Sequence, residues 1–166
     1  MADKSPDFLA ILEILADYKI DFIIVGGVCA VLHGAPVTTF DLDVVHKRIP
    51  ENLERLMSAL QELDAYYRGQ FGRKLKPDLF HLASAGHQLL ITRFGPFDLL
   101  GTIGKGHSYE DLVSFTTELQ ISKNLKIRLL NLETLIAIKE EVLRDTDKAM
   151  LPILRRTLEE KLKMDR

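Results

Sequence analysis

The sequence contains a single cysteine and carries almost no net charge. Cys29 has no partner for a disulfide within the chain and cannot build a thiolate metal cluster. We therefore expect a buried, inert thiol and a reducing compartment such as the cytoplasm. The formal net charge of −2 gives no general attraction to nucleic acids or anionic membranes. Any contact with a polyanion would have to come from a local patch.

Long apolar runs are also missing. The longest run, Phe22 to Leu32, is well short of the roughly 20 residues that span a bilayer. The opening residues, MADKSPDF, contain no apolar stretch of the kind that forms an export signal. These two absences predict a soluble protein with no membrane partner.

Several familiar catalytic motifs are absent as well. None of the histidines lies in an HExxH pattern or near a paired cysteine, which argues against a zinc site. There is no GxSxG element, no Walker-type lysine loop and no Rossmann fingerprint. His33 precedes Gly34 and is expected to end a helix. The remaining histidines are His46, His81, His87 and His107.

The apolar pattern that is present predicts an α/β or α+β fold, with a mixed sheet flanked by helices. The 166 residues are enough to bury a core without disulfides or metals. Predicted helices run from Ser5-Pro6 to Tyr18-Lys19, over 28–33, 49–63 and 109–115, and from 132 onward. Predicted strands are Phe22–Val25, Phe40–Val45, Leu89–Arg93, Phe97–Leu100, Leu119–Ile121 and Leu125–Leu129.

We expect one domain over residues 1–166, with the core at about 20–130 and C-terminal helices at 132–163. The segment 64–86 is the hardest to assign. Tyr66-Tyr67 and Leu79 to Leu82 are predicted as short strands around a basic run, and Gly95-Pro96 as the turn between two adjacent strands. The apolar helical tail is suited to packing on itself or on a partner, so an oligomer is one expectation.

Two aspartates interrupt the second predicted strand. Residues i and i+2 of a strand point to the same side, so Asp41 and Asp43 present two carboxylates to one place while Phe40, Leu42 and Val44 face the core. Two such charges are unfavourable unless a proton or cation lies between them, and Mg²⁺ prefers carboxylate oxygens. The alternative is the solvated charged face of an edge strand.

A glycine pair and a third acid accompany them. Gly26-Gly27 lies between a strand and a helix, where missing side chains let an anion approach backbone amides, although a tight turn is an equally good use of glycine. Asp98 lies in another apolar strand. If that strand neighbours Phe40–Val45, three carboxylates converge and can hold two metal ions; otherwise Asp98 is a strand-end acid facing water.

These residues together resemble the signature of the nucleotidyltransferase superfamily (the DNA polymerase beta-like fold). That signature is an apolar residue before a glycine pair, then a DxD, then a third acid on a later strand. The matching segments are Val25-Gly26-Gly27, Asp41-Leu42-Asp43 and Phe97-Asp98-Leu99. His33-Gly34 and Thr38-Thr39-Phe40 are similar to the minimal nucleotidyltransferases and to the toxins of abortive-infection toxin–antitoxin systems.

The resemblance extends to the C-terminal helices and covers about residues 20–155. The family has a helix bearing a lysine, followed by Arg-x-Lys-Asp. The corresponding residues are Lys139 and Arg144-Asp145-Thr146-Asp147, so Thr146 stands where the second lysine would be. This departure weakens one expected phosphate contact.

The resemblance implies Mg²⁺-dependent transfer of a nucleoside monophosphate from an NTP to a hydroxyl of a protein, RNA or small molecule, with release of pyrophosphate. It implies that Asp41 and Asp43 hold two metal ions and that Asp98 completes the site. Gly26 and Gly27 would line the triphosphate, Thr39 would add a hydroxyl, and Lys139 and Arg144 would supply positive charge. An antitoxin partner is a further implication.

Three alternatives stay open. The chain could be a non-catalytic nucleotide-binding protein or toxin–antitoxin partner that retains the fold, and Thr146 favours this. The acids could be solvated strand ends, and Lys139 and Arg144 part of a solvated helix face. The basic runs Lys47-Arg48 and 73–76 could contact a polyanionic acceptor such as RNA or be solvated loops.

Overall fold

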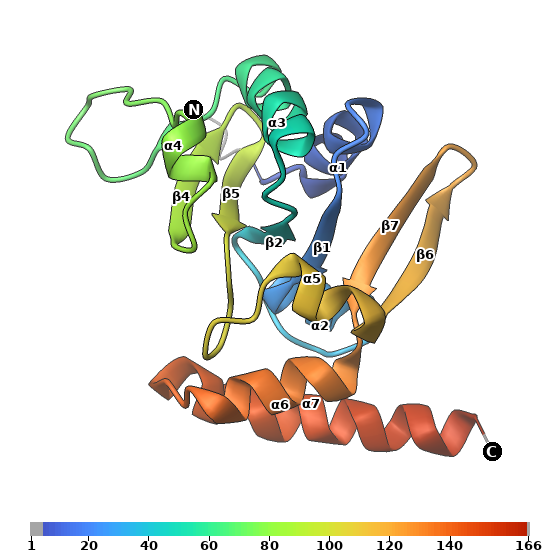
Figure 1. The fold of residues 1–166 in the computed structure, drawn as a ribbon. Coiled ribbons are helices and arrows are strands. Elements are labelled where there is room, and N and C mark those ends of the chain that lie inside the picture. Colours follow the sequence, from blue (N-terminus) through green and yellow to red (C-terminus); the bar gives the residue numbers. More distant parts are fainter. Residues whose placement is uncertain (1–4, 166) are drawn as a thin grey trace.

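A computed structural model describes residues 5–165, and a seven-stranded mixed sheet forms its centre (Figure 1). The strand order is β3-β4-β5-β2-β1-β7-β6, with β1–β7 and β2–β5 parallel and the other neighbours antiparallel. The strands are β1 (Phe22–Val25), β2 (Leu42–His46), β3 (Tyr66–Tyr67), β4 (His87–Thr92), β5 (Gly95–Leu100), β6 (Thr116–Ser122) and β7 (Leu125–Leu130).

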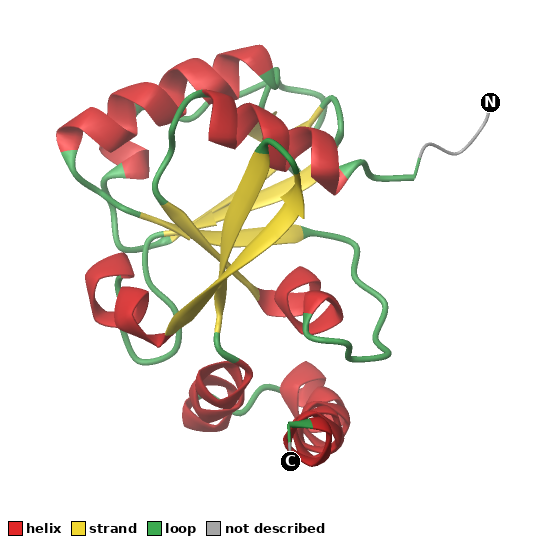
Figure 2. Ribbon diagram, turned by 90° about the vertical axis from the view of Figure 1, so that its right-hand side faces the viewer, coloured by secondary structure: helices red, strands yellow, loops and turns green. Residues whose placement is uncertain are grey.

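Helices lie on both sides of this sheet, so the predicted mixed sheet flanked by helices is confirmed. Helices α1 and α3 lie on one side, and α2, α5 and the C-terminal pair α6 and α7 lie on the other (Figure 2). The helices are α1 (Phe8–Asp17), α2 (Gly26–Leu32), α3 (Pro50–Glu62), α4 (Leu79–Leu82), α5 (Tyr109–Leu112), α6 (Leu132–Glu141) and α7 (Asp145–Met164), with a 3₁₀ turn at Val113–Phe115.

The core is built around the two central strands. All four residues of β1 are buried, as are Leu42 and Val44 of β2, and the buried cluster extends from Ile11 in α1 to Leu154 in α7. Strands buried on both faces read as short continuous apolar runs, which explains why β1 was predicted with its observed bounds. Within residues 5–165, no helix has both the length and the apolar character required to cross a bilayer.

Three local predictions were wrong. Leu79–Leu82 is the helical turn α4 rather than a strand, because the Asp78 side chain accepts a hydrogen bond from the His81 amide at 2.9 Å and caps it. The turn between β4 and β5 lies at Arg93-Phe94, two residues before the predicted turn at Gly95-Pro96. Gly95 and Pro96 are instead the first residues of β5. Phe40 is 72% exposed, since β2 begins only at Leu42.

A fourth difference concerns the first helix, which begins at Phe8 rather than at Ser5-Pro6. Asp7 is its N-cap, and the Asp7 carboxylate accepts a hydrogen bond from the Ala10 amide at 3.1 Å. Both Ser and Asp favour this position, so composition alone does not choose between them.

Candidate active site

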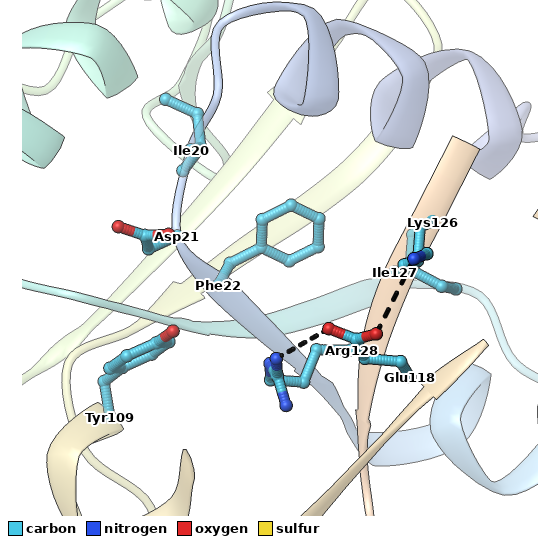
Figure 3. A pocket seen from close by; sticks show the side chains of 8 residues that line it. All are labelled: Ile20, Asp21, Phe22, Tyr109, Glu118, Lys126, Ile127 and Arg128. Carbon is cyan, nitrogen blue, oxygen red and sulfur yellow. Dashed lines mark hydrogen bonds and ion pairs between the residues drawn. The ribbon is translucent and has the colours of Figure 1, made fainter. Parts of the chain in front are cut away.

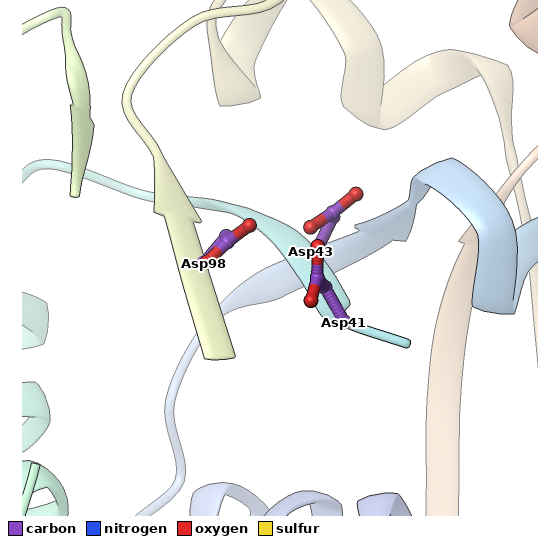
Figure 4. A group of neighbouring side chains, drawn as sticks. All are labelled: Asp41, Asp43 and Asp98. Carbon is purple, nitrogen blue, oxygen red and sulfur yellow. The ribbon is translucent and has the colours of Figure 1, made fainter. Parts of the chain in front are cut away.

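Strand register brings the three acids together. Strands β2 and β5 are parallel, and Asp43 pairs with Asp98, so their side chains emerge from neighbouring strands at the same level. Asp41 precedes β2 by one residue. One carboxylate oxygen from each acid lies within 4.8 Å of the others, and Figure 4 shows the three side chains gathered at this point. Acids that are distant along the chain therefore form a single cluster.

The cluster carries more negative charge than its surroundings balance. Burial raises the pKa of Asp43 to about 8, and repulsion from Asp98 and then Asp41 adds to the rise. A hydrogen bond between the Asp43 and Asp98 carboxyl groups also favours the protonated form of Asp43. Carboxylates crowded in this way share either a proton or a cation. Three oxygen donors at this spacing fit a hard divalent cation such as Mg²⁺.

Among residues 5–165, Arg68 is the one cation in direct contact with the cluster, and sequence reasoning missed it. Its Nη1 lies 2.7 Å from Asp98 Oδ1 and donates to the Leu90 carbonyl at 2.6 Å. Arg68 directly follows the edge strand β3, which reaches Asp98 only through the pairing of β3 with β4 and of β4 with β5. No motif in the sequence indicates this contact.

The glycine pair is required by close packing at the start of α2. Gly26 has φ of +68°, and a Cβ there would lie 2.3 Å from Asp43 Oδ2. A Cβ on Gly27 would lie 2.6 Å from Thr39 Oγ1. The left-handed backbone and the absent side chains together bring the first turn of α2 against Asp43 and Thr39. Thr39 Oγ1 donates to the Asp41 carbonyl at 3.1 Å and so holds the chain entering β2.

The two predicted phosphate-binding cations both pair with Asp147. Lys139 Nζ lies 3.1 Å from Asp147 Oδ1, and Arg144 Nε lies 3.1 Å from Oδ2. Burial opposes ionisation of Asp147, but hydrogen bonds from Arg144 and Lys139 lower its pKa. The Lys139 side chain is 12% exposed and the Arg144 side chain 68%. Lys139 also lies close enough to Asp43 to act against the rise in its pKa.

Cys29 and His33 serve the packing of α2. Cys29 is buried, as predicted; burial raises its pKa to about 12, and its Sγ donates to the Leu130 carbonyl at 3.3 Å. His33 caps the C-terminus of α2, as predicted, with Nε2 2.8 Å from the same carbonyl. Its Nδ1 accepts a hydrogen bond from Lys161 Nζ of α7 at 2.7 Å. The contacts of both side chains are therefore structural.

Two cavities lie away from the acids. One of about 200 Å³ opens beside the start of β1 (Figure 3). Its cations, Lys126 and Arg128, both pair with Glu118, and Asp21 adds a further negative charge, so phosphate is not favoured there. The other, of about 750 Å³, lies between Gly34–Pro36 and residues 152–160 of α7. Neither cavity is lined by Asp41, Asp43 or Asp98.

Comparisons with known proteins identify the fold. A scan against protein-family models and a search of curated proteins found no match. Among solved structures, TM1012 from Thermotoga maritima, provisionally described as a nucleotidyltransferase, is 19% identical with a TM-score of 0.56 over 92% of this chain and 91% of that one. The lincosamide antibiotic adenylyltransferase LnuA, solved with lincomycin bound, is 13% identical with a TM-score of 0.58 over 89% and 94%. The chain therefore has the nucleotidyltransferase fold.

Proposed function

We propose that this protein is a nucleotidyltransferase that moves a nucleoside monophosphate from an NTP to an acceptor hydroxyl and releases pyrophosphate. The observation that supports this most directly is the acid cluster: three carboxylate oxygens within 4.8 Å, one pair of them fixed by strand register. A nucleotidyltransferase fold around such a cluster gives the position and the ligand type that phosphoryl transfer needs. The names of both structural neighbours describe the same class of chemistry.

In this proposal Asp41 and Asp43 would hold two Mg²⁺ ions, and Asp98 would complete the site. Bound Mg²⁺ would neutralise the triphosphate and stabilise the charge that develops on the attacking and leaving oxygens. Gly26 and Gly27 keep the first turn of α2 close to Asp43 and Thr39, because a side chain at either position would clash with one of them. In this proposal their backbone would line the triphosphate. Lys139 would supply positive charge from α6, and Arg144 and Thr39 are further candidates for contact with the nucleotide.

The transfer itself is an in-line displacement at the α-phosphorus. The acceptor oxygen forms a bond to that phosphorus, and the bond to the bridging oxygen of the β-phosphate breaks, so that pyrophosphate leaves with the electron pair. The hydroxyl proton passes to a carboxylate oxygen of Asp98 and then to solvent. The Arg68 contact restrains Asp98 through its Oδ1.

Calorimetry with ATP and Mg²⁺ tests the proposal. The wild-type protein should bind ATP only when Mg²⁺ is present, and the double variant Asp41→Ala/Asp43→Ala should lose that binding. Asp17→Ala, which removes an exposed acid at the end of α1, is the matched control and should bind as the wild type does. Labelled NTPs offered together with a cell lysate then identify which class of acceptor, namely protein, RNA or small molecule, becomes labelled.

A non-catalytic nucleotide-binding protein or toxin–antitoxin partner is the second candidate. It is favoured by Thr146, which replaces the family's second lysine, and by Asp147, which engages both Lys139 and Arg144. Nucleotide binding that is undetectable or independent of metal would support this candidate over the enzyme.

A further inference from the structure

A loop of basic and aromatic residues begins at the acid cluster. The β3–α4 loop, residues 68–78, is the green loop beside α4 at the left of Figure 1. Over 68–77 it contains two arginines and two lysines and no acid. A hydrogen bond from the Tyr67 amide to the Leu75 carbonyl at 2.8 Å closes its base, and one from the Arg73 amide to the Gln70 carbonyl at 3.0 Å turns its tip.

Phe71 occupies the tip at a cost to the backbone. Its φ is +50° and that of Gly72 is +83°, so both central residues of the turn are left-handed. Such turns favour Asn, Asp and Gly, and a bulky residue there is an outlier. The Phe71 side chain is fully exposed, with a relative accessibility of 103%, and it buries nothing in exchange. A strained and exposed aromatic residue that does not stabilise the fold points to a role in binding another molecule.

Positive charge that the protein does not neutralise flanks this ring. Arg68 pairs with Asp98, and Lys76 lies 3.7 Å from Asp64. Arg73 and Lys74 are exposed and form no ion pair with any residue in the described range 5–165. The chain as a whole has a net charge of −2, so this pair of cations is a local concentration beside an exposed aromatic ring.

We propose that the β3–α4 loop binds a single-stranded nucleic acid and presents the hydroxyl at its end to the acid cluster. Exposed aromatic rings stack on bases of any sequence, and neighbouring cations contact the phosphates. Phe71 provides the ring, and Arg73 and Lys74 provide the cations. Phe80 of α4, which is 82% exposed, offers a second stacking surface next to the loop.

The loop connects this binding surface to the acid cluster. Arg68, at its base, contacts Asp98 directly, so a strand that follows the loop from its tip to its base ends beside the three acids. Only the presentation of the strand end to the acid cluster rests on the proposed function. A nucleotide would be added to the strand terminus by the displacement already described, whereas binding to the loop requires neither NTP nor metal.

Fluorescence anisotropy with a labelled single strand of about 12 nucleotides, without NTP or Mg²⁺, tests the binding step. Phe71→Asn removes the ring and tolerates the left-handed turn, and it should weaken binding roughly 5- to 150-fold. Phe71→Trp keeps an aromatic ring and should retain binding. Arg73→Ala/Lys74→Ala should weaken binding roughly 10- to 30-fold near 0.1 M salt and reduce the salt slope by about 1.4.

Matched controls lie at the opposite edge of the same sheet, beside β6 and β7. Phe115→Ala removes a half-exposed phenylalanine, and Lys123→Ala/Lys126→Ala removes two lysines from the β6–β7 hairpin. Neither change should alter the affinity. Equal losses in the control and loop variants, or no effect of any loop variant, would overturn the proposal.

Further binding measurements distinguish between the possible ligands of the loop. RNA and DNA strands of the same sequence show whether the ribose hydroxyl matters, and a duplex should bind more weakly because its bases are already stacked. If the loop variants leave strand binding intact but lose a protein partner, the surface is a protein interface and the nucleic-acid proposal fails. Loop-dependent strand binding without Mg²⁺-dependent ATP binding would uphold this surface while the proposed enzyme activity fails.

Discussion

Two acidic centres in this molecule have opposite electrostatic states. Asp147 lies between Lys139 and Arg144, whose hydrogen bonds lower its pKa. Asp43 faces Asp98 and Asp41, and burial together with repulsion raises its pKa to about 8. The protein supplies the counter-charges at the first centre and leaves them incomplete at the second. The comparison separates a carboxylate that holds two helices together from a cluster suited to an external cation.

The largest expected effect comes from Asp43→Asn. Nucleotidyl transfer should fall by at least about 1,000-fold, equivalent to about 4 kcal/mol, because a ligand of the proposed metal site is lost. The metal-free protein should be at least as stable as the wild type, since asparagine is neutral and does not have to take up a proton on folding as Asp43 does. Transfer assays and urea denaturation measure the two quantities, with Asp17→Asn as the control. Activity within tenfold of the wild type would contradict the assignment.

Asp147→Ala should have the converse effect on stability. It leaves Lys139 buried without its partner, and loss of one member of a buried pair lowers the free energy of unfolding by about 3 kcal/mol. Asp145→Ala is a matched control two residues away, since the Asp145 side chain is fully exposed, and it should change stability by less than about 0.5 kcal/mol. Urea denaturation measures the free energy of unfolding of both variants. Equal losses of stability would contradict the view that Asp147 is a structural carboxylate.

Arg68→Gln tests the arginine that already contacts the acid cluster. Asp98 would lose the contact that restrains it, and metal affinity should fall by about 10-fold, as expected for a residue that orients a metal ligand. Titration with Mn²⁺ followed by electron paramagnetic resonance measures this affinity without requiring turnover. Arg93→Gln, on the neighbouring hairpin turn, is the control. Tighter metal binding in Arg68→Gln would show that Arg68 competes with the metal.

The smallest predicted effect is a dependence on pH. Because the pKa of Asp43 is raised in the folded state, the folded protein retains a proton between about pH 4 and 8 that the unfolded chain has released. Metal-free stability should therefore fall as pH rises, by about 1 kcal/mol between pH 7 and 8. Mg²⁺ should restore more stability at pH 8 than at pH 6. Denaturation with and without chelator measures this, and Asp43→Asn should abolish the difference.

Local patterns were sufficient to predict much of the fold. The apolar run of β1 predicted that strand with its observed bounds, and two short apolar runs predicted β6 and β7. The helix predicted over 28–33 exists but begins at the glycine pair, as α2. Phe40 shows the limit of this reasoning, because an apolar residue beside a strand need not be buried: it precedes β2 and remains exposed. Burial depends on tertiary packing, which residue type indicates only on average.

Contacts between distant segments were harder to predict from the sequence. The pairing of Asp43 with Asp98 depends on β2 and β5 being neighbours. The sequence does not show whether these two strands pair, so the convergence of the acids could only be predicted on the assumption that they do. The Arg68 contact depends on two further strand pairings and on the conformation of one side chain, and no residue pattern encodes it. The engagement of Lys139 by Asp147 requires the packing of α6 on α7. Each of these contacts is set by topology.

The separation between Asp43 and Asp98 is fixed by the main chain. Hydrogen bonds between parallel strands hold neighbouring backbones roughly 4.8 Å apart, whatever side chains surround them. Extensive replacement of the core can therefore occur over evolutionary time without altering the backbone separation of these two residues. Such tolerance explains how a protein can drift beyond the reach of sequence searches while its architecture stays recognisable.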